Sequence, residues 1–162
     1  MLSKLLKLEE KDILSLVGSG GKTITMYRLG RELNKNKVLL TTSTKIGKIE
    51  IDNVITLEKF SDIEKMKISN EVYVSGNTIN NNKFTGITNE QLEEVKDKFD
   101  YIIIEADGSK RLPLKGWRDK EPVILNSSNK TLGIIPFDLY GKKLLELEIF
   151  QREIFMSIVG EE

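Results

Sequence analysis

The sequence predicts an α/β fold in which a mostly parallel sheet is flanked by helices, and three observations support this prediction. A strand-like run over 12–17, a helical segment over 22–34 and a second strand-like run over 37–44 follow one another closely, which is typical of a parallel βαβ unit. A third run over 100–108 is the most apolar in the chain and is expected at the centre of the sheet, covered on both faces. The chain is long enough to bury one core, so we expect a single domain over 1–162.

The chain is expected to begin with a short amphipathic helix at residues 2–6, laid against the sheet edge, because its leucines recur at helical spacing. The helix over 22–34 follows a glycine-rich turn and ends in the basic, turn-prone stretch 34–37. Four residues are predicted to form the buried side of this helix: Ile24, Tyr27, Leu29 and Leu33.

Two capping boxes predict the helices of the middle section. The box at 61–64, which starts with Ser61, opens a short helix, and the box at 88–91 opens a second helix that ends near Phe99. Ile87 precedes the second box and is placed to pack on Leu92 as a hydrophobic staple.

Strands and a hairpin are predicted from the remaining pattern. Residues 71–76 form the expected third strand along the chain, and the polar, asparagine-rich stretch 77–85 is expected to be a hairpin or excursion rather than a linker between domains. Beyond the central strand the expected elements are a strand over 122–125, a strand over 131–136, and a helix or two over 144–159.

Composition limits the chemistry that the chain can perform. It contains neither cysteine nor histidine, which excludes disulfides, zinc sites built from those residues, a thiol nucleophile and a histidine general base. Lys and Arg together number 25, as do Asp and Glu, so no net charge draws the chain toward nucleic acid or an anionic membrane. The first residues lack a signal peptide's apolar core, and no run is long enough to span a membrane. We therefore expect a cytoplasmic protein that binds neither nucleic acid nor a membrane.

A phosphate-binding loop is predicted directly after the first strand. Glycines let consecutive backbone N–H groups point into one concavity, the following helix adds partial positive charge, a lysine can reach the β- and γ-phosphates, and a threonine can ligate Mg²⁺. The loop fits neither standard form, because Leu16 stands where one form has glycine and Val17 where another has lysine. The alternative is a glycine-rich turn with an incidental Lys-Thr pair. The predicted loop residues are Gly18, Ser19, Gly20, Gly21, Lys22 and Thr23.

Two acidic residues end the most apolar strand. Side chains alternate along a strand, so Glu105 and Asp107 are expected on the same face. There one could hold Mg²⁺ together with Thr23, and the other could polarise a water or a substrate. Lys22, Glu105 and Asp107 are therefore the candidate catalytic residues. The alternative is a strand end whose acids simply face solvent.

The end of the second strand is expected to open onto the same crevice, because the fold places the carboxyl ends of parallel strands together. Thr42 and Thr44 can bond a phosphate oxygen or Mg²⁺, and Lys45 can neutralise charge. Threonine is also a common strand former, so an ordinary strand end is the alternative.

Positive charge follows the acidic pair. Lys110 and Arg111, with Lys115 and Arg118 nearby, are candidates to clamp an anionic substrate or the γ-phosphate. A solvated charged loop is the alternative.

Five motifs occur in a defined order along the chain. They are Val17-Gly18-Ser19-Gly20-Gly21-Lys22-Thr23, Thr41-Thr42-Ser43-Thr44-Lys45, Glu105-Ala106-Asp107-Gly108-Ser109-Lys110, Pro113-Leu114-Lys115 and Glu121-Pro122-Val123-Ile124. This series resembles the YqeC family, whose members are described as accessory proteins of selenium-dependent molybdenum hydroxylases or as selenium cofactor biosynthesis proteins. The resemblance spans nearly the whole chain. It implies a P-loop NTPase-like fold, a Rossmann-like three-layer sandwich, and a role in maturing or inserting a labile selenium-containing cofactor.

Two departures limit what the resemblance carries over. Family members usually have a histidine just before the Glu-Pro pair, where this chain has Lys120. They also usually continue well beyond the segment that matches 150–153, through further sheet and a motif suited to recognising a nucleotide base. The chain is therefore expected to be a member shortened at the C-terminus, a fragment of a longer product, or a phosphate-binding half that needs a partner.

The predicted function is that of an accessory protein which binds Mg-ATP or Mg-GTP and uses hydrolysis or phosphoryl transfer during maturation of the cofactor of a selenium-dependent molybdenum hydroxylase. Without a thiol the chain cannot carry selenium as a selenosulfide, so nucleotide binding would energise or gate a transfer performed elsewhere. The implied partner is the molybdenum cofactor or a molybdenum hydroxylase. A cofactor-binding chaperone without turnover and a small-molecule kinase are the alternatives, and the sequence leaves the oligomeric state open.

Overall fold

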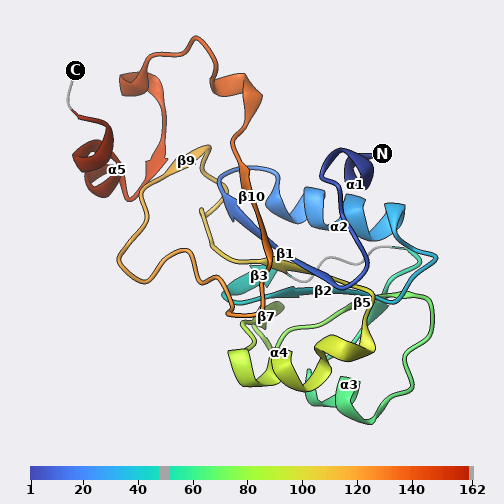
Figure 1. The fold of residues 1–162 in the computed structure, drawn as a ribbon. Helices are drawn as coiled ribbons and strands as arrows, with labels where there is room; N and C mark the ends of the chain where they lie inside the picture. The colour runs from blue at the N-terminus through green and yellow to red at the C-terminus, as the bar shows by residue number, and fades with distance from the viewer. Residues whose placement is uncertain (48–51, 161–162) are drawn as a thin grey trace.

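A computed structural model describes residues 1–47 and 52–160 of the chain. Within these residues six strands form one sheet in the order β10-β1-β8-β2-β5-β4, and every neighbouring pair is parallel (Figure 1). The predicted α/β fold with a parallel sheet is confirmed. The strands are β1 (Asp12–Gly18), β2 (Val38–Thr42), β4 (Ile55–Thr56), β5 (Val72–Val74), β8 (Tyr101–Glu105) and β10 (Lys130–Ile134).

The most apolar strand lies in the interior of the sheet, as predicted. Ile103 of β8 pairs with Leu14 of β1 on one side and with Leu40 of β2 on the other, and all three side chains are buried. The two strands of the βαβ unit are therefore parallel, but β8 separates them. This order brings the carboxyl ends of β1, β2 and β8 together at one edge of the sheet.

Helices cover both faces of the sheet and complete three layers (Figure 1). On one face, α2 contributes Met26 and Leu29 to a buried cluster with β1, β2 and β8. On the other face, α3 and α4 contribute Ile63 and Leu92 to a second cluster, which includes Ile102 of β8. The helices of the core are α1 (Leu2–Leu5), α2 (Lys22–Glu32), α3 (Ser61–Lys65), α4 (Asn89–Val95) and the 3-10 turn η1 (Lys96–Lys98).

The first helix lies on α2, so its predicted position against the sheet edge is wrong. Near the end of α2, the Glu32 carboxylate accepts the backbone N–H groups of Leu2 at 2.9 Å and Ser3 at 2.8 Å. These bonds, with the one from Ser3 contributing most, lower the pKa of Glu32 to about 2. The free N–H groups at the start of α1 find a carboxylate there, which explains why α1 packs on α2.

The two predicted capping boxes have different outcomes. Thr88 caps α4 with both hydrogen bonds of the box, so this prediction is confirmed, and Ile87 lies in the same buried cluster as Leu92. In contrast, α3 starts directly after Phe60 and has no side-chain cap, so the box predicted at Ser61 is wrong.

The buried side of α2 differs from the prediction at one residue. Met26, Leu29 and Leu33 are buried at three- and four-residue spacing, and Tyr27 borders this stripe. Ile24 lies on the other side of the helix and is 75% exposed, so its predicted burial is wrong.

Two smaller sheets accompany the main sheet. The hairpin predicted over 77–85 is confirmed, and its second strand also pairs with a short strand that follows β2. A parallel pair joins the segment after β8 to the C-terminal part of the chain. These strands are β3 (Lys45–Gly47), β6 (Ile79–Asn80), β7 (Lys83–Thr85), β9 (Leu114–Lys115) and β11 (Ile149–Phe150).

The strand predicted over 122–125 is not formed, so that prediction is wrong. Val123 donates one backbone hydrogen bond to Ala106 at 2.8 Å, but Pro122 has no N–H group with which to extend a ladder. The strand predicted over 131–136 is confirmed as β10.

Beyond β10 the chain leaves the sheet and forms an arm, residues 135–160, which we call the C-terminal arm (Figure 1). It contains β11 and a helix within the predicted range 144–159, preceded by two 3-10 turns. None of the described helices is both long and apolar enough to cross a membrane. The helical elements of the arm are η2 (Phe137–Leu139), η3 (Leu144–Glu146) and α5 (Arg152–Val159).

A candidate phosphate-binding site

The loop between β1 and α2 has a backbone conformation that glycine adopts readily and other residues do not. The φ angles of Gly18, Gly20 and Gly21 are +99°, +69° and +83°. A Cβ atom on Gly18 would lie 2.4 Å from the carbonyl oxygen of Ile134, and one on Gly20 would lie 2.3 Å from Cγ of Pro136. Glycine is therefore required here by the backbone angles and by the close approach of the chain at the end of β10.

Several N–H groups of this loop are available to an anion. The Ser19 N–H donates to the Ile134 carbonyl at 2.9 Å, but no hydrogen bond within the described part of the chain uses the N–H groups of residues 20–23. These groups lie at the start of α2, where the helix dipole adds partial positive charge. The arrangement suits a phosphate group.

Lys22, the first residue of α2, turns its ammonium group back toward the loop. Its side chain is 4% exposed, and its Nζ lies 3.0 Å from Oδ1 of Asp107 and donates to the carbonyl of Gly18. The contact with Asp107 is an ion pair whose angles fall outside hydrogen-bond geometry. A phosphate held by the loop would compete with both oxygens for this ammonium group.

Asp107 is the centre of a buried charge cluster. Its Oδ2 accepts the Gly18 N–H at 3.0 Å and the indole N–H of Trp117 at 2.8 Å, and it lies 3.6 Å from the ammonium nitrogen of Lys115. With Lys22 at Oδ1, both oxygens are engaged, so this carboxylate fixes the loop and its lysine. The predicted metal role of Asp107 stays a prediction, and it would require one of these contacts to open.

Lys115 is buried and does not line the described cavity, so its predicted contact with an anionic substrate stays a prediction. Its side chain is buried and donates to the carbonyl of Gly108 at 2.8 Å and to the carboxylate of Glu121 at 2.9 Å. The local sequence did not reveal these partners, because they come together only when the segment after β8 folds over Asp107.

Glu105 and Thr23 form a second, separate pair. The Thr23 hydroxyl donates to Glu105 Oε2 at 2.7 Å, and both residues line the same cavity. Burial raises the pKa of Glu105, against the opposing effects of the Thr23 bond and the Lys22 charge. A hydroxyl beside a carboxylate matches the oxygen ligands of Mg²⁺. The described residues contain no group of three or more acidic side chains placed to hold a metal, so phosphates and water would supply the other ligands.

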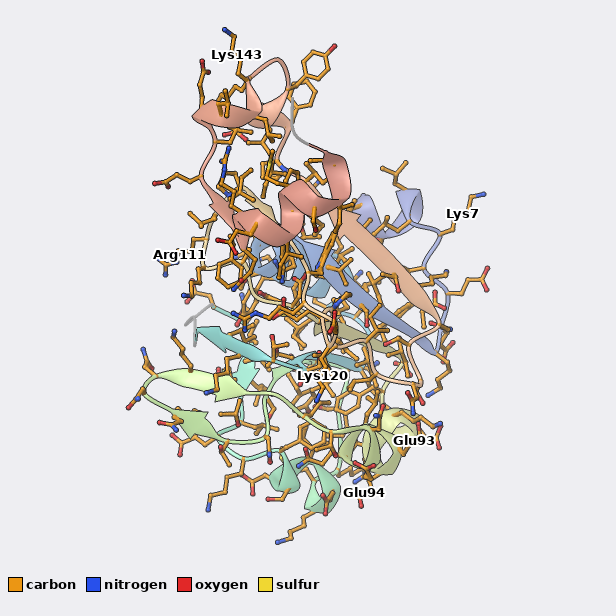
Figure 2. All side chains as sticks on the ribbon, turned by 90° about the vertical axis from the view of Figure 1, so that its left-hand side faces the viewer. Lys7, Glu93, Glu94, Arg111, Lys120 and Lys143 are labelled. Atoms are coloured by element: carbon orange, nitrogen blue, oxygen red, sulfur yellow. The ribbon has the colours of Figure 1, made fainter. Side chains whose placement is uncertain are left out.

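The cavity beside the loop has a volume of about 470 Å³. Two basic side chains also line it, Lys45 from β3 and Arg111 from the segment after β8. Figure 2 shows Arg111 where the C-terminal arm meets the sheet, far from Glu94 on α4. Residues from three separate parts of the chain thus meet there: Gly20, Gly21, Lys22, Thr23, Ile24, Lys45, Ile46, Gly47, Glu105, Ser109 and Arg111.

Besides Gly18 and Ser19 of the loop, three predicted binding residues lie outside the described cavity wall. The buried Thr42 hydroxyl donates to the Glu105 carbonyl at 2.9 Å and accepts the Thr44 N–H at 3.1 Å, so these threonines shape the end of β2 beside the acidic strand. Lys110 is exposed, and its Nζ lies 5.2 Å from the centre of the Phe150 ring. Direct contacts of these three residues with a ligand stay predictions.

A family model described as "YqeC protein" matches residues 14–153, a range that contains the loop, both acids and Arg111. The chain belongs to the YqeC family. It is 26% identical over 155 residues to a protein of Escherichia coli (strain K12) named "Uncharacterized protein YqeC". This alignment covers 91% of the chain and 60% of the relative, so the chain spans about three fifths of that relative's length. No solved structure was found to match the chain.

Sequence reasoning missed two aromatic residues of the YqeC site. Trp117 donates its indole N–H to Asp107 from ten residues further along the chain, and no spacing in the sequence marks it. Tyr27 is buried in the core as predicted, but the sequence did not reveal that it lies near Glu105. Its hydroxyl has no hydrogen bond among the described residues, and burial with the nearby Glu105 charge raises its pKa to about 12. Its position four residues after Thr23, on the same helix face, was the available signal.

Proposed function

We propose that this YqeC protein binds the Mg²⁺ complex of a nucleoside triphosphate, ATP or GTP, at residues 18–23 and hydrolyses it or transfers its terminal phosphoryl group. The observation that carries the proposal is the convergence, around one cavity, of free loop N–H groups, a buried lysine, a Thr23–Glu105 pair and two basic side chains. Such a set matches a P-loop NTPase-like site.

Each group has a distinct task in this proposal. The loop N–H groups and Lys22 hold the β- and γ-phosphates, while Thr23 and Glu105 are the candidate Mg²⁺ ligands. Bound Mg²⁺ neutralises charge on the phosphates. Asp107 orients Lys22 through the 3.0 Å ion pair. Arg111 and Lys45, which line the same cavity, contact the terminal phosphate or an anionic acceptor.

Phosphoryl transfer suits a chain without cysteine or histidine, because positioning and charge neutralisation supply most of its catalysis. We further propose a role in maturing the cofactor of a selenium-dependent molybdenum hydroxylase, with that cofactor or enzyme as partner and the cytoplasm as location, because this role is the one described for YqeC family members. In this role, nucleotide binding gates or energises a selenium transfer that another protein performs.

A binding protein without turnover is the second candidate, and one observation favours it. Among the described residues that line the cavity, Glu105 is the only acidic one, and it already accepts a hydrogen bond from Thr23. Asp107 is held by two lysines. Asp107 is therefore not free to polarise a water or an acceptor hydroxyl, as general base catalysis requires, and Glu105 has only Oε1 left for that task.

Calorimetric titration tests nucleotide binding. We expect Mg-ATP or Mg-GTP to bind, and Lys22→Ala to weaken binding about 10- to 100-fold, the size expected for losing charged hydrogen bonds to phosphate. Lys35→Ala, an exposed lysine just beyond α2, is the matched control and should bind as the wild type does. Equal affinity of the Lys22→Ala and Lys35→Ala proteins would contradict the proposal.

Phosphate release over many turnovers then separates the two candidates. Release that depends on Lys22 supports the enzyme, whereas tight binding with no release supports the binding protein.

A further inference from the structure

We infer that Phe137 and Tyr140, at the start of the C-terminal arm, form the surface on which the base of the bound nucleotide stacks. The inference rests on the proposed function, because it concerns the nucleotide whose phosphates the loop holds. Neither residue was predicted to belong to the site.

The aromatic pair follows directly after the segment that contacts the loop. The Ile134 carbonyl accepts the Ser19 N–H at 2.9 Å, and Pro136 approaches Gly20 so closely that a Cβ there would lie 2.3 Å from its ring. Phe137 follows directly in the chain. The start of the C-terminal arm therefore continues one wall of the phosphate loop.

The order of the strands around β1 indicates the direction in which a nucleotide would lie. β1 stands between β8 and β10, so the loop that follows it has one flank on each side. The Thr23–Glu105 pair lies on the β8 flank. Thr23 and Glu105 would hold a Mg²⁺ ion that neutralises charge on the β- and γ-phosphates, so these phosphates belong on that flank. The α-phosphate and the nucleoside then extend toward β10, where Pro136 and Phe137 lie.

The pair presents exposed aromatic rings beside an apolar cavity. The rings of Phe137 and Tyr140 are parallel within 3°, with centroids 6.0 Å apart, and the residues are 88% and 86% exposed. They border a cavity of about 440 Å³ whose other walls, including Leu114, Leu139 and Leu147, are apolar. An exposed π surface beside an uncharged hollow suits a flat base and does not suit a phosphate.

The residues that line this cavity also determine how well the site distinguishes one base from another. No charged or amide side chain from the described residues lines this cavity, so hydrogen bonds that would distinguish adenine from guanine are few. Stacking alone tolerates any base, since each has a π face. ATP and GTP should therefore bind within a few-fold of each other.

The test compares nucleotides with inorganic triphosphate, which has no base. Phe137→Ala and Tyr140→Ala should each weaken Mg-ATP and Mg-GTP binding about 5- to 100-fold, the range for loss of base stacking, and should leave Mg-triphosphate binding unchanged. Phe137→Trp should restore nucleotide affinity. Leu145→Ala, which removes another exposed apolar side chain of the arm, is the matched control and should change neither.

The outcomes separate this inference from the proposed function. If the wild type binds triphosphate but Phe137→Ala binds ATP as tightly as the wild type does, the inferred stacking surface is wrong and the proposed phosphate site is retained. The aromatic pair would then be a candidate contact surface for a protein partner. Equal losses for ATP and triphosphate would also overturn it, since they indicate a distorted loop. If wild type binds neither ligand, the proposed function itself fails.

Discussion

The two flanks of the phosphate loop have opposite chemistry although they touch the same few residues. On the β8 flank, Asp107 accepts the Gly18 N–H and pairs with Lys22. On the β10 flank, Ile134 accepts the Ser19 N–H and an apolar segment follows. A loop that follows a strand with a neighbour on each side acquires two walls, and here one wall carries charged side chains while the other is apolar.

The flanks also differ in burial. Asp107, Lys22 and Lys115 are buried, so their charges interact in a low-dielectric environment where removing one partner is costly. Phe137 and Tyr140 on the other flank are exposed, so they can be changed with little effect on folding. We expect mutations on the β8 flank to affect stability and ligand binding together, and those on the exposed arm to affect ligand binding alone.

The largest effect should come from Asp107→Asn. Removing its charge leaves Lys22 without a carboxylate and Lys115 with Glu121 alone, so we expect a loss of roughly 3 kcal/mol in the free energy of unfolding, measured with denaturant. The exposed Asp119→Asn is the matched control and should be nearly neutral. A phosphate ligand should recover part of the loss, because it gives Lys22 a new anion.

Similar stability of the two variants would show that the charges of the β8 flank are not coupled. The difference in burial between the two flanks would then not predict which mutations affect stability together with ligand binding.

A smaller effect is expected from Gly20→Ala, which acts where the loop meets the β10 flank. The new Cβ would require a left-handed backbone at φ +69° and would overlap the Pro136 ring, so we expect a loss of about 2 kcal/mol in stability and weaker nucleotide binding. Gly133→Ala is the matched control within β10, because no atom lies within 4 Å of its added Cβ. It should change stability by less than about 1 kcal/mol.

If Gly20→Ala retained full stability and affinity, the close approach between loop and arm would not matter. That result would also weaken the case for a base on the β10 flank.

The β8 flank was partly predictable from the sequence, whereas the β10 flank was not. The order of strand, glycine loop and helix, and the acids at the end of an apolar run, are local patterns, and they placed Lys22, Thr23 and Glu105 correctly around one cavity. The contact of Pro136 with Gly20 joins segments far apart in the chain, and the contact of Trp117 with Asp107 closes an irregular segment after β8. No periodicity records such contacts.

The same limit explains where prediction and structure differ. The apolar stretch 122–125 resembles a strand locally, but Pro122 and the absence of a neighbouring ladder prevent one. Lysine side chains are usually exposed, yet Lys115 is buried because its ammonium group pairs with Glu121 and Asp107. Local pattern identifies what an element can be, and tertiary partners decide which charges remain available to a ligand.

The smallest effect concerns pH and the Thr23–Glu105 pair. Burial raises the pKa of Glu105 above its ordinary 4.5, so the folded protein binds this proton more tightly than the unfolded chain does. Stability from this group is therefore greatest below pH 4.5 and falls as pH rises through the folded-state pKa. Mg²⁺ requires the carboxylate, so the Mg²⁺-dependent gain in nucleotide affinity should show the opposite trend and decline on acidification above the usual range for glutamate.

Glu105→Gln isolates that contribution, because it keeps the shape of the side chain and removes its charge. We expect the variant to bind nucleotide with nearly the same affinity with or without Mg²⁺, and to lose the pH dependence of the difference, when both are titrated across the acidic range. Glu94→Gln, on the distant α4, should retain the wild-type profile (Figure 2). A Glu105→Gln protein whose Mg²⁺ gain still declined with acid would assign the metal to another residue, and the β8 flank would then hold phosphate without holding the ion.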